Sequence, residues 1–146
     1  MRRILTYWLP PIAWATVILT ASTDAFSSSS TIGWLERVTG WLGYQLAPST
    51  AGIANHLIRK TAHLTEYGIL SALSFRALRG ERLRWSPRWA AGALLLSLAL
   101  ASIDEFHQTF VPSRTGTWQD VVLDTVGAAV AQVVIRAAQV LLSLSS

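Results

Sequence analysis

Apolar residues dominate four stretches of the chain, each close to the length that crosses a lipid bilayer. These stretches are Ile4–Ala21, Leu57–Leu78, Pro87–Phe106 and Trp118–Leu142. A membrane helix needs about 20 predominantly apolar residues, because the hydrocarbon core is roughly 30 Å thick and a helix rises about 1.5 Å per residue. The pattern therefore predicts an all-α, polytopic membrane protein built as a four-helix transmembrane bundle.

The second stretch differs from the others because polar residues are spread along it. It reads LIRKTAHLTEYGILSALSFRAL and contains Lys60, the one lysine of the chain. Such a segment is too polar to enter a bilayer easily by itself. We therefore expect the other three helices to surround it.

The segment between the first two stretches, residues 22–56, is long for a connection without structure. After a run of serines, apolar residues recur at the spacing of one helical face: Trp34, Leu35, Val38, Trp41 and Leu42. This spacing predicts an interfacial amphipathic helix in the first outer loop, anchored by its tryptophans. The pattern fits a simple cap on the bundle and a substrate lid equally well.

The composition agrees with this class of protein. Of 146 residues, 51% are hydrophobic and only 14% are charged, against about 25% charged in soluble domains. Once four spans are set aside, no room remains for a second domain, so residues 1–146 are predicted to form a single one. The absence of cysteine excludes disulfides, thiolate metal ligands and a cysteine nucleophile. The net charge of +4 does not indicate a nucleic-acid partner, because the basic residues form no continuous stripe.

The basic residues instead predict how the chain is oriented. Eight of the twelve flank one set of span ends: Arg2, Arg3, Arg76, Arg79, Arg82, Arg84, Arg88 and Arg136. Lysine and arginine accumulate on the cytoplasmic side of membrane proteins. We therefore expect a bacterial inner-membrane protein with both termini in the cytoplasm. Arg2-Arg3 before an apolar run would also fit a secretory signal, but that run is long and no clear cleavage pattern follows it.

Ionisable residues gather at the opposite, extracytoplasmic ends of the spans. Lys60, His63 and Tyr67 share one face of the second stretch with Ser71 and Ser74. Asp104 and Glu105 close the third stretch, and Asp120 and Asp124 open the fourth, on a face shared with Gly127 and Ala131. One such charge near the middle of a spanning helix costs roughly 2.5–3.5 kcal/mol. The charges must therefore pair or line a wet cavity, which makes them a candidate functional site.

Three of these residues also have simpler interpretations. Lys60 could extend its ammonium to the membrane surface. Asp120 could cap a helix, because Thr117-x-x-Asp120 has the spacing of a capping box. Arg114, in the loop above the carboxylates, could pair with Glu105 or Asp120, or bind a phosphate or carboxylate from outside.

Two segments resemble the VanZ-like family of small bacterial membrane proteins. They are KTAHLTEYGILSAL and SIDEFHQTFVPSRTGTWQDVVLDTVGAAV. The resemblance implies a polytopic membrane protein and a link to resistance against teicoplanin-type glycopeptide antibiotics. The family pattern falls on Lys60, His63, Tyr67, Asp104, Glu105, Gln108, Arg114, Asp120 and Gly127. The chain departs from it at Asp124, where the family usually has asparagine, and at Ala131, where a second glycine often follows.

These observations lead to an enzyme hypothesis. His63 acts as general acid or base, oriented by Asp104 or Glu105, while Lys60 and Arg114 stabilise an anionic substrate or transition state. Further substrate contacts come from the remaining polar residues: Tyr67, Gln108, Asp120 and Asp124. The expected partner is a membrane lipid or lipid-linked envelope substrate, or a glycopeptide antibiotic.

Other functions remain open. No nucleophile motif such as G-x-S-x-G and no H-E-x-x-H motif identifies a reaction, and the same charges would serve a non-catalytic binder. A proton-coupled carrier is the weaker third reading. No cofactor is expected, and a divalent metal is the less favoured alternative because Lys60 and Arg114 lie nearby.

Overall fold

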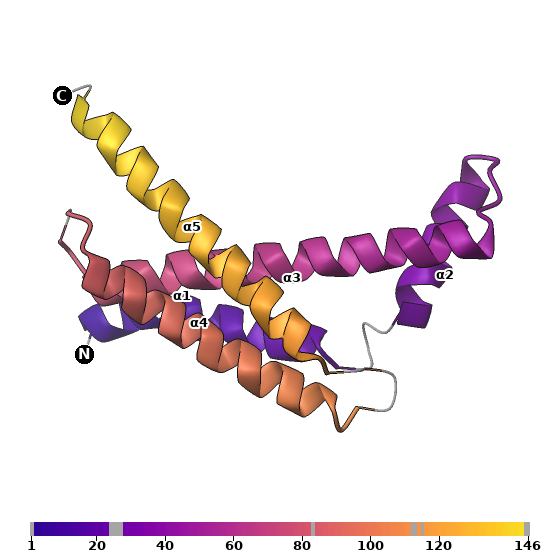
Figure 1. Cartoon of the computed structure of the whole chain (residues 1–146), viewed down its shortest axis with the longest axis horizontal. Coiled ribbons are helices and arrows are strands. Elements are labelled where there is room, and N and C mark those ends of the chain that lie inside the picture. Colours follow the sequence, from indigo (N-terminus) through magenta and orange to yellow (C-terminus); the bar gives the residue numbers. More distant parts are fainter. Residues whose placement is uncertain (1, 24–27, 83, 112–113, 115, 145–146) are drawn as a thin grey trace.

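The computed structural model describes residues 2–23, 28–82, 84–111, 114 and 116–144. This part of the chain contains five helices and no strand, which confirms the all-α prediction. The helices are α1 (Arg2–Ala21), α2 (Ser28–Trp41), α3 (Pro48–Arg79), α4 (Pro87–Gln108) and α5 (Trp118–Leu144) (Figure 1). Residues 24–27 of the predicted first loop and Pro112 of the family pattern lie outside the described residues.

Four helices coincide with the four predicted stretches, but the start of α3 was predicted wrongly. α3 begins at Pro48, where proline in the first turn fits the fixed backbone geometry of a helix start, and not at Leu57. With 32 residues it is about 48 Å long. Its first turns therefore extend beyond the other helices, and α2 lies beside them (Figure 1).

Three of the described helices are long and apolar enough to cross a membrane: α1 from Ile4, α4 and α5. This composition is compatible with a membrane protein. α3 is not among them, because charged and polar side chains interrupt its apolar positions. Its crossing stays a prediction. α2 is the helix predicted from the tryptophan spacing, and both Trp34 and Trp41 are exposed.

α3 packs against each of the other four helices. The Trp14 indole of α1 donates a hydrogen bond to the backbone carbonyl of Glu66 at 2.9 Å. A buried apolar cluster also joins α1, α3 and α4; its residues are Ile18, Tyr67, Leu70 and Ala101. The most polar helix is thus the central one, as its composition predicts.

Small residues bring α3 and α5 into close contact where the two helices cross (Figure 1). A Cβ atom on Gly68 would lie 3.3 Å from the carbonyl oxygen of Gly127, and one on Gly127 would collide with the backbone of Leu64. The amide nitrogen of Gln132 donates to the hydroxyl of Ser71 at 2.8 Å. Since Leu64 directly follows His63, this contact fixes the register of the helices beside the candidate site.

We expect Gly127→Ala to destabilise the protein. The added methyl group meets backbone that cannot move aside like a side chain, and overpacking of this kind costs about 1–3 kcal/mol. Thermal unfolding of the detergent-purified protein measures the effect. Gly33→Ala is the matched control, because nothing lies within 4 Å of its new methyl group on α2. Equal melting temperatures for both variants would contradict this account of the contact.

Candidate functional site

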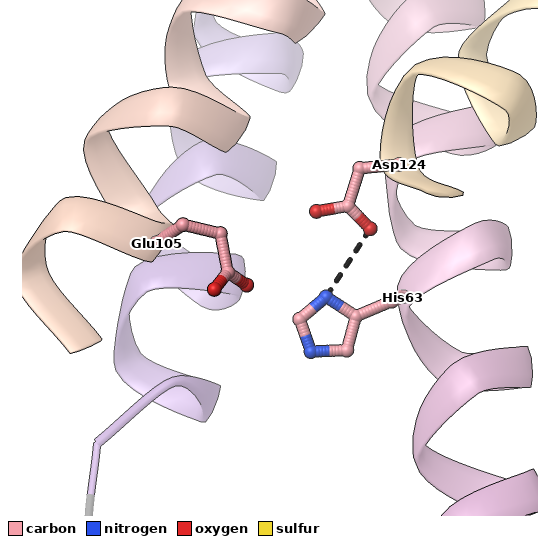
Figure 2. A group of neighbouring side chains, drawn as sticks. All are labelled: His63, Glu105 and Asp124. Carbon is pink, nitrogen blue, oxygen red and sulfur yellow. Dashed lines mark ion pairs between the residues drawn. The ribbon is translucent and has the colours of Figure 1, made fainter. Parts of the chain in front are cut away.

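Three helices bring His63, Glu105 and Asp124 together (Figure 2). The side chains come from α3, α4 and α5. One atom of each that could coordinate a metal, a histidine nitrogen or a carboxylate oxygen, lies within 4.8 Å of the other two. Glu105 and Asp124 are buried, and the side chain of His63 is 12% exposed. Residues separated by up to 61 positions thus form one compact polar cluster.

The His63–Asp124 ion pair connects α3 to α5. The Nδ1 atom of His63 lies 3.2 Å from a carboxylate oxygen of Asp124, which is fully buried. The sequence analysis proposed Asp104 or Glu105 for the role of orienting His63, whereas the carboxylate against Nδ1 in the structure is that of Asp124. A buried carboxylate is stable only with a partner, and the imidazole of His63 lies opposite it.

Glu105 connects α4 to the start of α5. One of its carboxylate oxygens accepts a hydrogen bond from the backbone N–H of Thr117 at 2.7 Å. This contact satisfies one of the N–H groups that the start of a helix leaves unpaired. Gly116 is required beside it, because a Cβ there would collide with the carbonyl oxygen of Glu105.

Asp104 connects α4 to the end of α1. Its carboxylate accepts hydrogen bonds from the hydroxyl of Ser22 at 2.8 Å and from the amide of Gln108 at 3.2 Å, and all three side chains are buried. Sequence reasoning missed Ser22. A single serine after an apolar run carries no spacing signal, so only the folded arrangement identifies it.

Lys60 and Asp120 form a second ion pair, at the mouth of the cluster. Their side chains are 34% and 17% exposed, so water reaches both. Asp120, which lies in the first turn of α5, thus has a charged partner from α3. Because exposed ion pairs contribute only about 0–1 kcal/mol, we assign the larger energetic role to the buried His63–Asp124 pair.

Arg114 and Tyr67 are two further buried residues near His63: Arg114 lines the same pocket as His63, and Tyr67 follows His63 by about one turn of α3. The guanidinium of Arg114 is buried and donates to the backbone carbonyls of Ala21 at 2.9 Å and Thr23 at 3.2 Å. It therefore fastens the α4–α5 loop to the end of α1. Tyr67 is fully buried, and its hydroxyl has no hydrogen-bond partner among the described residues.

Two pockets reach His63 from different sides of α3. The larger, of about 380 Å³, is lined by Gly52, Asn55, His56, Arg59, Lys60, His63, Thr117 and Asp120. The smaller, of about 160 Å³, is lined by Ala21, Ser22, Thr31, Ile58, Arg59, Ala62, His63, Glu66 and Arg114. Arg59, which the sequence analysis did not select as a site residue, lines both pockets.

An apolar groove adjoins the smaller pocket. It has a volume of about 480 Å³ and is lined by Trp14, Ile58, Thr61, Ala62, Thr65, Glu66 and Ile69. Ile58, Ala62 and Glu66 line both spaces. A polar space beside His63 therefore continues into an apolar one along α1 and α3.

The sequence model of one protein family, VanZ/LLP1, matches residues 7–141, nearly the whole chain. This chain belongs to the VanZ/LLP1 family. The resemblance found in the two sequence segments is thereby confirmed. No curated protein and no solved structure matches the chain. The function of this VanZ/LLP1 protein must therefore be argued from its own site.

The family pattern maps onto this VanZ/LLP1 structure in three groups. The first group lies in or beside the cluster, together with Asp124: His63, Tyr67, Asp104, Glu105, Gln108 and Arg114. Lys60 and Asp120 lie at its mouth, and Gly127 forms the helix contact. An imidazole held by a carboxylate at one nitrogen can transfer a proton at the other. A histidine with two carboxylates can also bind a cation.

Proposed function

We propose that this VanZ/LLP1 protein acts on the anionic head group of a membrane lipid or lipid-linked envelope substrate. The observation that carries the proposal is the shared lining of the polar pocket and the apolar groove. A lipid has the same two parts, a polar head and an apolar chain. With the head beside His63, the chain would lie along Trp14 and Ile69.

Positive charge around the larger pocket favours a phosphate-bearing head group. Its lining includes Arg59, Lys60 and His56 within one helical turn of α3. Guanidinium and ammonium groups form strong, charge-assisted hydrogen bonds with phosphate oxygens. The larger pocket, of about 380 Å³, shares Arg59 and His63 with the smaller pocket and borders the apolar groove only through it.

We assign His63 the role of general acid or base. Asp124 holds its Nδ1, which leaves Nε2 for the substrate. Lys60 and Arg59 would bind the anionic group, while Asp120 positions Lys60. The remaining residues support the site: Glu105 and Asp104 fix α4, Gln108 holds Asp104, and Tyr67 and Arg114 enclose His63.

We also propose that four helices, α1, α3, α4 and α5, span the membrane. α2 would lie in the membrane interface on the extracytoplasmic side. Both termini and the α3–α4 link lie at one end of the molecule and α2 at the other (Figure 1). At the first end, arginines lie over aromatic rings: Arg76 over Tyr7, Arg82 over Trp89 and Arg136 over Trp85. Basic and aromatic residues of this kind mark a cytoplasmic interface.

This orientation gives the depth of the site. His63 precedes the end of α3 at Arg79 by a length of roughly 24 Å, at about 1.5 Å per residue. In a hydrocarbon core about 30 Å thick, it would lie one to two turns below the extracytoplasmic surface. The site of a bacterial inner-membrane protein would then face envelope substrates.

The alternative is a non-catalytic binder of a lipid head group, a cell-wall precursor or a glycopeptide antibiotic. The observation that favours it is the position of Lys60 and Arg59 at the pocket mouth, where they can bind an anion without help from His63. The link to antibiotic resistance rests on the resemblance to the VanZ-like family.

Orientation can be measured with topology reporters. A reporter fused after Ser146 should read cytoplasmic, and one inserted between Tyr44 and Leu46 should read outside, because of the asymmetry of basic residues. Paired reporters that are active on opposite sides of the membrane serve as mutual controls. A C-terminus on the outer side would move the site to the inner leaflet and exclude action on outer envelope substrates.

Catalysis and recognition can be separated with His63→Gln and Arg59→Gln. If His63 transfers a proton, His63→Gln should lower the rate of lipid modification by about 10²–10⁴-fold. Arg59→Gln should mainly raise the substrate concentration at which the reaction reaches half its maximal rate. The measurement is mass spectrometry of membrane lipids over time, at increasing levels of supplied phospholipid, in cells lacking the native protein.

Matched membrane levels and two exposed control variants, His107→Gln and Arg37→Gln, separate site effects from general ones. Glycopeptide susceptibility is recorded for the same strains. An unchanged lipid profile, with resistance that survives His63→Gln but not Arg59→Gln, would reject the enzyme and leave the binder.

A further inference from the structure

The cluster of His63, Glu105 and Asp124 has the composition of a metal site. One nitrogen and two carboxylate groups lie within 4.8 Å of one another, and the side chains point toward a common space (Figure 2). We propose that these three residues bind one divalent transition-metal ion of the Zn²⁺ or Mn²⁺ type. This goes beyond the sequence interpretation, in which a metal was the less favoured alternative.

Unsatisfied buried oxygens support the inference independently of the cluster itself. One carboxylate oxygen of Asp124 faces Nδ1 of His63 at 3.2 Å, but its other oxygen and one oxygen of Glu105 have no partner among the described residues. Asp124 is fully buried and Glu105 is 5% exposed. Buried carboxylate oxygens without donors are costly, and protein structures satisfy them with hydrogen bonds, water or metal ions. A cation between the two residues would bind one oxygen of each.

The balance of charge points the same way. Asp104, Glu105 and Asp124 place three carboxylates in the buried part of the site, and Arg114 is the buried guanidinium beside them. Ionised carboxylates in a low-dielectric environment need compensating positive charge. Three carboxylates and one guanidinium leave two negative charges. A protonated His63 offsets one of them, whereas a divalent ion bound to neutral His63 offsets both.

The two cations that weighed against a metal are directed elsewhere. Lys60 pairs with Asp120 at the partly exposed mouth. Arg114 directs its Nη2 atom to the carbonyls of Ala21 and Thr23. Asp120, the partner of Lys60, is not one of the three ligands. The printed contacts of both cations therefore leave the three ligand groups facing one another.

The donor set selects the class of ion. Mg²⁺ and Ca²⁺ prefer sites built of oxygen alone, whereas Zn²⁺ accepts histidine nitrogen with carboxylate oxygen. With bonds of about 2.1 Å, a tetrahedral ion holds its ligand atoms about 3.4 Å apart, so side-chain movements on the order of 1 Å complete the site. The hydrogen bond from Thr117 orients Glu105 as an outer-shell contact. Three protein ligands leave a coordination position open.

This inference deepens the proposed function and rests on it in one respect, the presence of a lipid head group beside the metal. In the metal-bound site His63 is a ligand, so the proton-transfer role assigned to it above belongs to the metal-free site. Metal binding itself can be measured without any substrate. The two proposals can therefore fail separately.

The test uses the full chain, purified in detergent, stripped with a chelator and titrated with Zn²⁺, Mn²⁺ or the spectroscopic probe Co²⁺. Calorimetry and elemental analysis should give one ion per chain, and Co²⁺ should show absorption typical of a nitrogen- and oxygen-ligated site. Glu105→Gln and Asp124→Asn should each weaken binding by at least about 10²-fold, because even residues that orient metal ligands are worth about 10–100-fold. Glu36→Gln, on the exposed face of α2, should bind like wild type.

Wild-type measurements keep the test decisive if a variant fails to fold. A chelator-stripped wild type that melts cooperatively yet takes up no ion overturns the inference, as does Glu105→Gln with wild-type affinity. Uptake of one ion by the wild type and its loss in Glu105→Gln support the metal site even if no lipid is modified. The absence of lipid modification would reject only the proposed function. Lipid modification that persists in excess chelator, without metal uptake, retains the function and rejects the metal.

Discussion

The buried pair of His63 and Asp124 is the constraint on which the rest of the structure depends. A carboxylate with no exposed surface must have a partner, because the free energy of burying it alone is several kcal/mol. In this chain the partner comes from another helix, so α3 and α5 must meet in one register. Glycine at 127 permits that approach, since any larger residue would collide with the backbone beside His63.

The other helices are arranged around this pair. α4 brings Glu105 to the first turn of α5 and Asp104 to the hydroxyl that ends α1. Arg114 then fastens the connecting loop to α1. Each of these polar contacts joins two helices, so the groups that would do chemistry also hold the fold together. The site residues of this VanZ/LLP1 protein are therefore also structural residues, beside the buried apolar cluster of Ile18, Leu70 and Ala101.

Much of the architecture could be predicted because it depends on local periodicity. The apolar stretches gave α1, α4 and α5 to within a few residues, and the polar stripe on α3 runs from partly exposed Lys60 to buried Tyr67 and Ser71. The first turns of α3 were missed because residues 48–56 carry no continuous apolar face. The partner of His63 was missed for another reason. The register between two helices depends on where their backbones can approach each other, and the periodicity of a single helix carries no information on that approach. Ser22 was missed because its role exists only in the contact with Asp104.

A double-mutant cycle on His63 and Asp124 tests the central claim most directly. The free energy of unfolding is measured in detergent for His63→Leu, Asp124→Leu and the double variant. We expect each single change to cost about 3–5 kcal/mol, because it breaks the buried pair. The double variant should cost less than the sum by at least about 1 kcal/mol, within the range found for residues in contact. Effects that add to within about 0.5 kcal/mol would show that the two residues act independently and would contradict the account.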